Sequence, residues 1–203
     1  MKSIKMSSFL LLSFLLFSCS HSLNNNLEKI DDPLRSVHAN AENSLYQIGG
    51  TWINQDGNPV KLQKLSGKVQ VVAMIFTSCG YACPKIVHNM KEIERQLPAS
   101  VRKETNFLLI SFDSKTDTPE RLKQYADQRM LGSNWTLLHG TPDEVRLMSM
   151  LLNVQYIPLQ GGGFNHSNII TILDETGSIY KRIEGLDISV TQAVKEIETA
   201  TQS

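Results

Sequence analysis

VQVVAMIFTSCGYACPKIVHNMKEIERQL, residues 69–97, is the stretch that decides the fold of this chain. Its first part, residues 69–76, is an apolar run of the length typical of a buried strand. A turn containing Cys79 and Cys83 follows, and Pro84 then opens a helix, because the N–H that proline lacks would be unpaired at the first helical position. Apolar residues continue the helix at helical spacing: Ile86, Val87, Met90, Ile93 and Leu97. The stretch therefore predicts a strand–turn–helix unit with two thiols in its turn.

The two cysteines lie at or near the N-terminus of this helix. There the helix dipole and the free backbone amides favour a thiolate over a thiol. Cys79 and Cys83 are four residues apart and thus also within reach of a disulfide. A disulfide that closes so short a loop adds little stability, so a functional pair is favoured over a stabilising one. Thiolates attack disulfides and bind soft metals, and the pair alone leaves both chemistries open.

The N-terminus has the pattern of an export signal. Two lysines precede an apolar run, residues 9–17, which is too short to span a bilayer. The run ends in Leu16-Phe17-Ser18-Cys19, which resembles a bacterial lipobox with Cys19 at the cleavage point. We therefore expect residues 1–18 to be a lipoprotein signal peptide and Cys19 to be lipidated, so that the exported protein is anchored at the periplasmic face of a membrane. The alternative is an ordinary secretory signal in which Cys19 has no role.

Composition divides the rest of the chain into two parts. Residues 19–43 are polar with few large apolar side chains, so we expect a lipid-anchored linker. Residues 44–203 have the patterning of one folded domain, whose Cys79 and Cys83 form a pair in an oxidising compartment. The 203 residues include 20 Lys and Arg against 20 Asp and Glu, and this zero net charge gives no sign of a nucleic-acid surface.

Strand and helix patterns alternate along the domain. The elements that we expect are a hairpin over residues 50–62, strands over 69–76, 106–112 and 135–139, helices over 84–97, 119–130 and 142–152, a second hairpin over 168–183 and a helix over 188–199. Such alternation indicates a sheet covered on both faces. The order favours an α/β protein with a thioredoxin-like fold, in which a central mixed sheet has an N-terminal β-hairpin extension and flanking helices.

The carboxyl ends of the central strands are where sites gather in such sheets. Cys79, Cys83 and Asp113 are all expected there. Thioredoxin-type oxidoreductases use a C-x-x-C pair and place a cis-proline just before the strand that faces it. This chain has C-x-x-x-C instead, and His166 stands in the corresponding place before the second hairpin.

These motifs, taken in order, resemble one family. Cys79-Gly80-Tyr81-Ala82-Cys83-Pro84 is similar to the C-x-x-x-C-P motif of the Sco/SenC copper chaperones, and His166 is similar to their ligand histidine. Residues 111–120 resemble the S-x-D-x-x-x-D-T-P segment of the family. Residues 52–57 and 65–69 fit its opening. The resemblance covers the chain from about Ser44 to the C-terminus.

The resemblance implies that Cys79, Cys83 and His166 bind one copper ion. Two thiolates and an imidazole suit Cu(I) and can also hold Cu(II), whereas Zn²⁺ would want a fourth ligand. The resemblance also implies delivery of copper to a respiratory enzyme subunit, typically the CuA centre of cytochrome c oxidase. Only reduced thiols would load copper, so a periplasmic thiol reductant is an expected partner. Asp113 is either a second-shell or docking residue or an ordinary turn residue.

Two alternative hypotheses make the protein an enzyme, whereas a copper chaperone is not one. A thiol–disulfide oxidoreductase would need Cys79 and Cys83 but not His166. A peroxidase would share the fold, but its Pro-x-x-x-Thr-x-x-Cys pattern is absent from the sequence.

Other residues are given structural roles. His88 and His139 are expected to be ordinary core or surface residues, and Asp117 together with Thr118-Pro119 is expected to cap the helix that follows. The run Gly161-Gly162-Gly163 is expected in a loop that either lets His166 swing or is simply a flexible surface loop.

Overall fold

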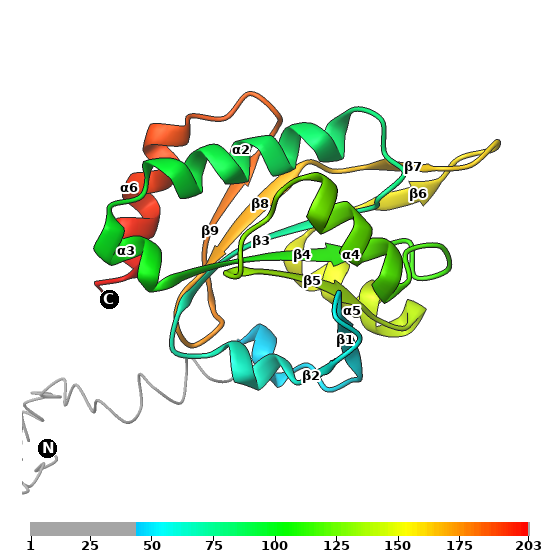
Figure 1. Ribbon diagram of the computed structural model, residues 1–203, viewed down its shortest axis with the longest axis horizontal. Helices are drawn as coiled ribbons and strands as arrows, with labels where there is room; N and C mark the ends of the chain where they lie inside the picture. The colour runs from blue at the N-terminus through cyan, green and yellow to red at the C-terminus, as the bar shows by residue number, and fades with distance from the viewer. Residues whose placement is uncertain (1–43, 203) are drawn as a thin grey trace, which may run out of the picture. The chain divides into compact units, whose positions relative to one another are not determined.

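The structure is a computed structural model that describes residues 44–202 (Figure 1). These residues lie within one compact unit. The predicted signal peptide and linker, including Cys19, lie outside the described residues. Among residues 44–202, none of the helices has the length and apolar character needed to cross a membrane.

Strands and helices alternate along most of the domain. In chain order the elements are η1 (Leu45–Gln47), β1 (Trp52–Asn54), β2 (Pro59–Val60), η2 (Leu62–Leu65), β3 (Val69–Ile75), α2 (Ala82–Gln96), α3 (Ala99–Lys103), β4 (Thr105–Ser111), α4 (Pro119–Gln128), β5 (Trp135–His139), α5 (Pro142–Leu152), β6 (Tyr156–Pro158), β7 (Phe164–His166), β8 (Ile169–Leu173), β9 (Ile179–Glu184) and α6 (Val190–Ala200).

Seven strands form the central sheet in the order β2-β1-β5-β4-β3-β8-β9. The strands β3, β4 and β5 are parallel, and β1 and β8 pair with their outer edges in the antiparallel sense. The β1–β2 hairpin therefore extends the sheet at the β5 edge. This confirms the predicted α/β, thioredoxin-like fold with a central mixed sheet and an N-terminal hairpin extension.

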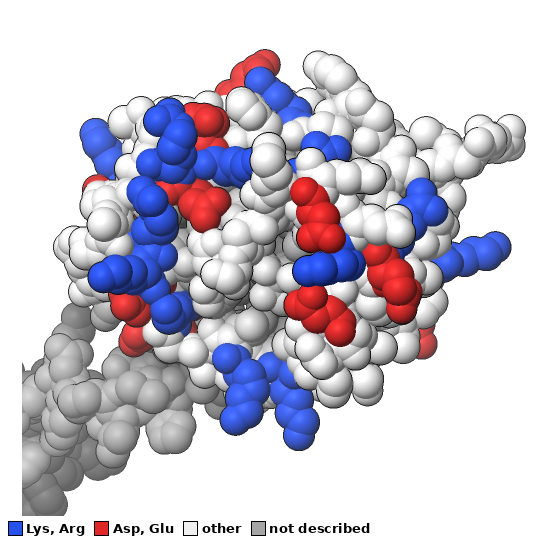
Figure 2. All heavy atoms as spheres, viewed as in Figure 1, with Lys and Arg blue, Asp and Glu red and all other residues white. Residues whose placement is uncertain are grey.

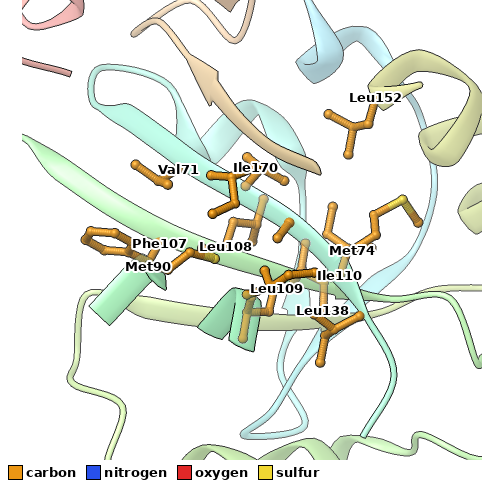
Figure 3. Packing of buried hydrophobic residues seen from close by; sticks show 14 of the residues in the cluster. Val71, Met74, Met90, Phe107, Leu108, Leu109, Ile110, Leu138, Leu152 and Ile170 are labelled. Carbon is orange, nitrogen blue, oxygen red and sulfur yellow. The ribbon is translucent and has the colours of Figure 1, made fainter. Parts of the chain in front are cut away.

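Helices cover both faces of this sheet. In Figure 1, α2, α4 and α6 lie across one face, and α5 lies behind the other. All seven residues of β3 are buried, as expected for an interior strand flanked by β4 and β8. Figure 3 shows Val71 of β3, Phe107 of β4 and Met90 of α2 packed in the resulting core.

Local sequence signals fix most helix starts. Thr118 caps α4 and Pro142 opens α5, both as predicted, and Thr141 caps α5. The helix α2 begins at Ala82 rather than at Pro84. This is possible because the N–H groups of the whole first turn lack helical partners, so proline is tolerated there. Cys83 consequently lies inside the first turn of α2 and not before it.

The sequence did not predict α3 or the separate ribbon formed by β6 and β7. The two strands of this ribbon pair antiparallel, with Tyr156 opposite His166. The predicted loop over Gly161-Gly162-Gly163 is only the turn of the ribbon, and His166 lies on β7. All three glycines have positive φ angles (98°, 100° and 78°), which residues with a side chain rarely adopt.

Candidate metal centre

Both cysteines lie at the carboxyl end of β3. We call residues 76–83, which connect β3 to the first turn of α2, the cysteine loop. Within it Cys83 is fully buried, whereas Cys79 is partly exposed. The backbone N–H of Cys83 donates to Sγ of Cys79 at 3.3 Å, and both thiols are free. In this short turn the Cys83 thiol therefore lies in the core, and the Cys79 thiol lies at the surface.

His166 reaches the thiols from β7, more than 80 residues later in the chain. Its Nε2 lies 3.5 Å from Sγ of Cys83. Its Nδ1 lies 2.9 Å from the carbonyl oxygen of Ser167, which can only accept, so Nδ1 carries the proton. This hydrogen bond leaves the Nε2 lone pair facing the sulfurs. The ligand atoms of Cys79, Cys83 and His166 all lie within 4.8 Å of one another.

Aromatic rings hold the imidazole in place. The ring of His166 lies 5.9 Å from that of Phe76 and 5.2 Å from that of Phe112. Phe164 packs against both phenylalanines, at 5.2 Å each, and Tyr156 stacks on Phe112. The sequence analysis missed this aromatic cluster, although Phe76 and Phe112 follow two neighbouring parallel strands directly and so had to meet at this edge of the sheet.

Asp117 holds the cysteine loop through hydrogen bonds. It is fully buried, and its carboxylate accepts hydrogen bonds from the backbone N–H of Thr77 (2.9 Å), the Thr77 hydroxyl (2.5 Å) and the Ser111 hydroxyl (2.7 Å). The predicted cap of the next helix is supplied by Thr118, and the expectation that Asp117 shares in it is wrong. A carboxylate with three donors inside the protein joins the cysteine loop to β4 instead.

The two thiols differ in acidity because their surroundings differ. Burial alone would raise the pKa of Cys79, but hydrogen bonds, among them those from the backbone N–H groups of Cys83 and Tyr81, outweigh it and lower this pKa to about 7. Burial raises the pKa of Cys83 well above the ordinary thiol value, despite a hydrogen bond with the Phe76 backbone, and a charge on Cys79 raises it further. The predicted preference for thiolates at the helix start is thus correct for Cys79 and wrong for Cys83.

An open cleft of about 700 Å³ gives access to the cluster. The cleft is lined by residues 78–82 of the cysteine loop, by residues of the ribbon between Leu159 and His166, and by Leu186. Tyr81 and Leu159 are apolar side chains on its rim, exposed to 79% and 52%. A ligand from another molecule can therefore approach the partly exposed thiol and the imidazole.

The remaining predicted residues lie apart from this cluster. Asp113 is half-buried after β4, and its carboxylate accepts from the backbone N–H of Thr116 at 3.2 Å, as in a turn. His88 is exposed on α2. Nδ1 of His139 lies 2.9 Å from the carbonyl oxygen of Asp117. Among the described residues, only Cys79, Cys83 and His166 come together as a group of three metal-ligating side chains.

The donor set fits a soft metal ion. Two sulfurs and one imidazole nitrogen are ligands that Cu(I) prefers, and the Nε2 lone pair is already available. A structural zinc site needs four ligands, and the described residues offer three at this place. A thioredoxin-like sheet with two thiols and an imidazole at one edge defines the class: a thioredoxin-fold protein with a candidate thiolate–imidazole metal site.

Comparison with known protein families identifies one family within this class. The model of the SCO1/SenC family matches residues 40–202, and the chain belongs to that family.

Two curated relatives agree with this assignment. A putative copper-binding protein of Stutzerimonas stutzeri is 27% identical over 131 residues, which cover 63% of each chain. The SCO1 protein homolog of Bacillus subtilis is 34% identical over 91 residues, which cover 44% of this chain and 47% of the relative. The matches therefore span about half to two thirds of the length of these relatives.

Solved structures show the same fold. A SCO1/SenC family lipoprotein from Bacillus anthracis superposes with a TM-score of 0.67 at 26% identity, covering 74% of this chain and 91% of that one. BsSco, described as a Sco family cytochrome c oxidase assembly protein with a disulfide switch, gives 0.64 at 25% identity, covering 75% and 91%. Copper-bound ScoI of Bradyrhizobium japonicum gives 0.63 at 22% identity, covering 74% and 96%.

Proposed function

We propose that this protein is a membrane-tethered copper metallochaperone. It binds one copper ion through Cys79, Cys83 and His166 and delivers it to a respiratory copper enzyme, such as the CuA site of cytochrome c oxidase. The observation that carries the proposal is the convergence of two sulfurs and a lone-pair nitrogen within 4.8 Å from two distant segments. Relatives named for copper binding and for oxidase assembly support the choice of metal and of client.

The three ligands have different tasks in this proposal. Cys79 is partly exposed and ionises most readily, so it meets the incoming ion first. Cys83 then binds the metal as a thiolate and releases its proton to water, because a coordinated thiol is deprotonated. His166 completes the set from the ribbon side of the cleft. Three ligands leave one side open toward the cleft, where a ligand of the acceptor can enter and take the ion away.

The redox state of the thiols gates loading. A disulfide between Cys79 and Cys83 would remove both thiolates, so the oxidised protein cannot hold copper. A dithiol reductant in the periplasm would restore the pair by thiol–disulfide exchange. Residues 1–18 act as a lipoprotein signal peptide and residues 19–43 as the linker from lipidated Cys19, and the B. anthracis neighbour named as a lipoprotein supports this part. Asp113, at the same edge of the sheet, is a docking residue for the acceptor.

The test is a titration of the reduced full chain with Cu(I), against a chromophoric chelator, and with Cu(II), by visible absorption. His166→Ala should weaken Cu(II) binding by at least about 100-fold, since loss of even an outer-sphere partner of a ligand costs 10- to 100-fold. His88→Ala is the matched control, because His88 is an exposed histidine outside the cluster. Equal affinities and spectra in all three proteins would exclude His166 as a ligand.

A second function, thiol–disulfide exchange with the cysteines of a copper-enzyme subunit, has an observation of its own. A partly exposed Cys79 above a buried Cys83 is the arrangement of an attacking and a resolving thiol. This activity needs no imidazole ligand. It should survive in His166→Ala, in which copper binding fails, and should disappear in Cys79→Ser.

A further inference from the structure

The end of the domain opposite the metal centre carries a group of positively charged side chains. Lys61 precedes η2, Lys64 lies in it, Lys68 precedes β3, and Arg102 and Lys103 end α3 just before β4. We call these five residues the basic end. Figure 2 shows Lys and Arg side chains gathered along this rim, over α3 and over the chain between β2 and β3. Since β3 and β4 are parallel, their amino ends lie together here and their carboxyl ends lie at the metal centre.

These charges are not neutralised inside the protein. Among the described residues, none of the five takes part in an ion pair. Lys68 donates to the carbonyl oxygen of Lys103, and Arg102 donates to that of Leu97 at 2.8 Å, which positions both cations without cancelling their charge. Two exposed carboxylates, Glu104 and Glu175, and two half-buried ones, Glu94 and Asp174, lie near this end, so five cations stand against four carboxylates there.

The chain enters the described domain at this same end. The Ser44 hydroxyl donates to the carbonyl oxygen of Thr176 at 2.5 Å, and the Tyr46 hydroxyl donates to that of Leu65 at 3.3 Å, between Lys64 and Lys68. The 43 residues before Ser44 include Cys19. An anchor at Cys19 thus leads into the domain beside the basic end and not beside the cleft.

We infer that the basic end binds the anionic headgroups of the membrane in which Cys19 is anchored, so that the copper cleft faces away from the lipid. This inference rests on the tethering in the proposed function. Each Lys or Arg within a Debye length of an anionic surface raises binding by about fivefold. The seven residues of β3 place the metal centre about 20 Å further out, because a strand rises about 3.3 Å per residue. The cleft is then open to the water-exposed domain of an acceptor.

Lysine footprinting of the lipidated full chain tests the orientation. The chain is reacted with an acetylating reagent on vesicles of phosphatidylethanolamine and phosphatidylglycerol, and the acetylated lysines are quantified by mass spectrometry. Lys61, Lys64 and Lys103 should be protected several-fold relative to chain in solution, whereas Lys85 and Lys115, exposed at the metal end, should react as before. Protection of Lys85 and Lys115 instead would overturn the inference.

Matched charge variants test the electrostatics. In the full chain with Cys19→Ser, which cannot be lipidated, Lys61→Gln, Lys64→Gln and Lys103→Gln together should lower binding to phosphatidylglycerol vesicles about 10- to 100-fold. The control variant Lys115→Gln, Arg146→Gln and Lys195→Gln removes the same charge elsewhere and should bind as the parent does. Equal loss in the two variants, or no loss in the first, contradicts the inference. Tethering itself is read separately, from the lipid mass on Cys19, and the proposed metal site from copper titration.

Discussion

The cysteine loop and the β6–β7 ribbon carry the side chains of the proposed metal centre, but different contacts hold the two segments in place. The cysteine loop follows β3, an interior strand of the sheet, and is held by the buried Asp117 carboxylate. The ribbon is a separate pair of three-residue strands. It packs against the cysteine loop mainly through aromatic rings, as between Phe164 and Phe76. The thiols are thus positioned by the core of the domain, whereas the imidazole depends on how the ribbon docks.

The first prediction concerns the Asp117 hydrogen bonds that hold the cysteine loop. Asp117→Asn should lower the free energy of unfolding by about 3 kcal/mol, because an amide turns an acceptor into a donor facing buried donors. Urea denaturation measures this as a fall in the midpoint at constant m-value. Asp113→Asn, in the same segment, should cost less than about 1 kcal/mol because that carboxylate closes an exposed turn. The reverse ranking would show that Asp117 does not hold the loop.

The second prediction separates the two thiols within the loop. In the reduced, metal-free protein, iodoacetamide should modify Cys79 about 100-fold faster than Cys83 at pH 7, because only Cys79 is both exposed and substantially ionised. With its pKa lowered to about 7, the rate at Cys79 should rise through pH 6–8 and level off above pH 8. Alkylation quenched at a series of times and quantified by mass spectrometry gives both rates. Similar rates for the two thiols would refute the asymmetry.

The third prediction weakens the docking of the ribbon. Phe164→Leu removes ring contacts with Phe76 and Phe112, each worth about 1 kcal/mol, and should lower copper affinity about tenfold while the thiols stay in place. Ile157 lies on the other strand of the ribbon and is 62% exposed, so Ile157→Ala serves as the control and should leave affinity unchanged. Competition with a Cu(I) chelator measures both variants. Unchanged affinity in Phe164→Leu would mean that the rings do not position His166.

The smallest effect is expected at Glu144, which lies outside both the cysteine loop and the ribbon. The Glu144 carboxylate is partly buried, which opposes ionisation, but it accepts from the backbone N–H groups of Thr141 (2.7 Å) and Thr51 (2.5 Å), and the net effect lowers its pKa. A lowered pKa stabilises the fold above the unfolded value and loses this effect as the pH falls through the folded one. Because the group is largely open to solvent, Glu144→Gln should cost about 0.5 kcal/mol at pH 7. Thermal unfolding of both proteins should show this difference vanish below about pH 4, and a constant difference would contradict it.

The sequence predicted those parts of the molecule in which local chemistry decides. Thr118-Pro119 and Thr141-Pro142 mark their helix starts correctly, because capping and the missing proline N–H act within one turn. The cysteine pair and His166 were found from their motif and their position before the second hairpin.

The parts that the sequence did not predict depend on contacts between distant segments. The strand Tyr156–Pro158 contains a proline and shows no alternation of apolar and polar residues, so only its pairing with Phe164–His166 defines it. Asp117 reads as a helix cap in the sequence, and only the approach of Thr77, 40 residues earlier, makes its carboxylate a buried acceptor. The acidity of Cys83 likewise depends on burial, which no spacing rule reveals.

X-ray absorption on the reduced, copper-loaded full chain tests the central claim most directly, because it counts the atoms bound to the ion. The account predicts two sulfurs and one imidazole nitrogen around copper, with the nitrogen lost in His166→Ala and kept in His88→Ala. A centre with sulfur ligands alone in the unmodified protein, identical in spectrum to that of His166→Ala, would contradict it.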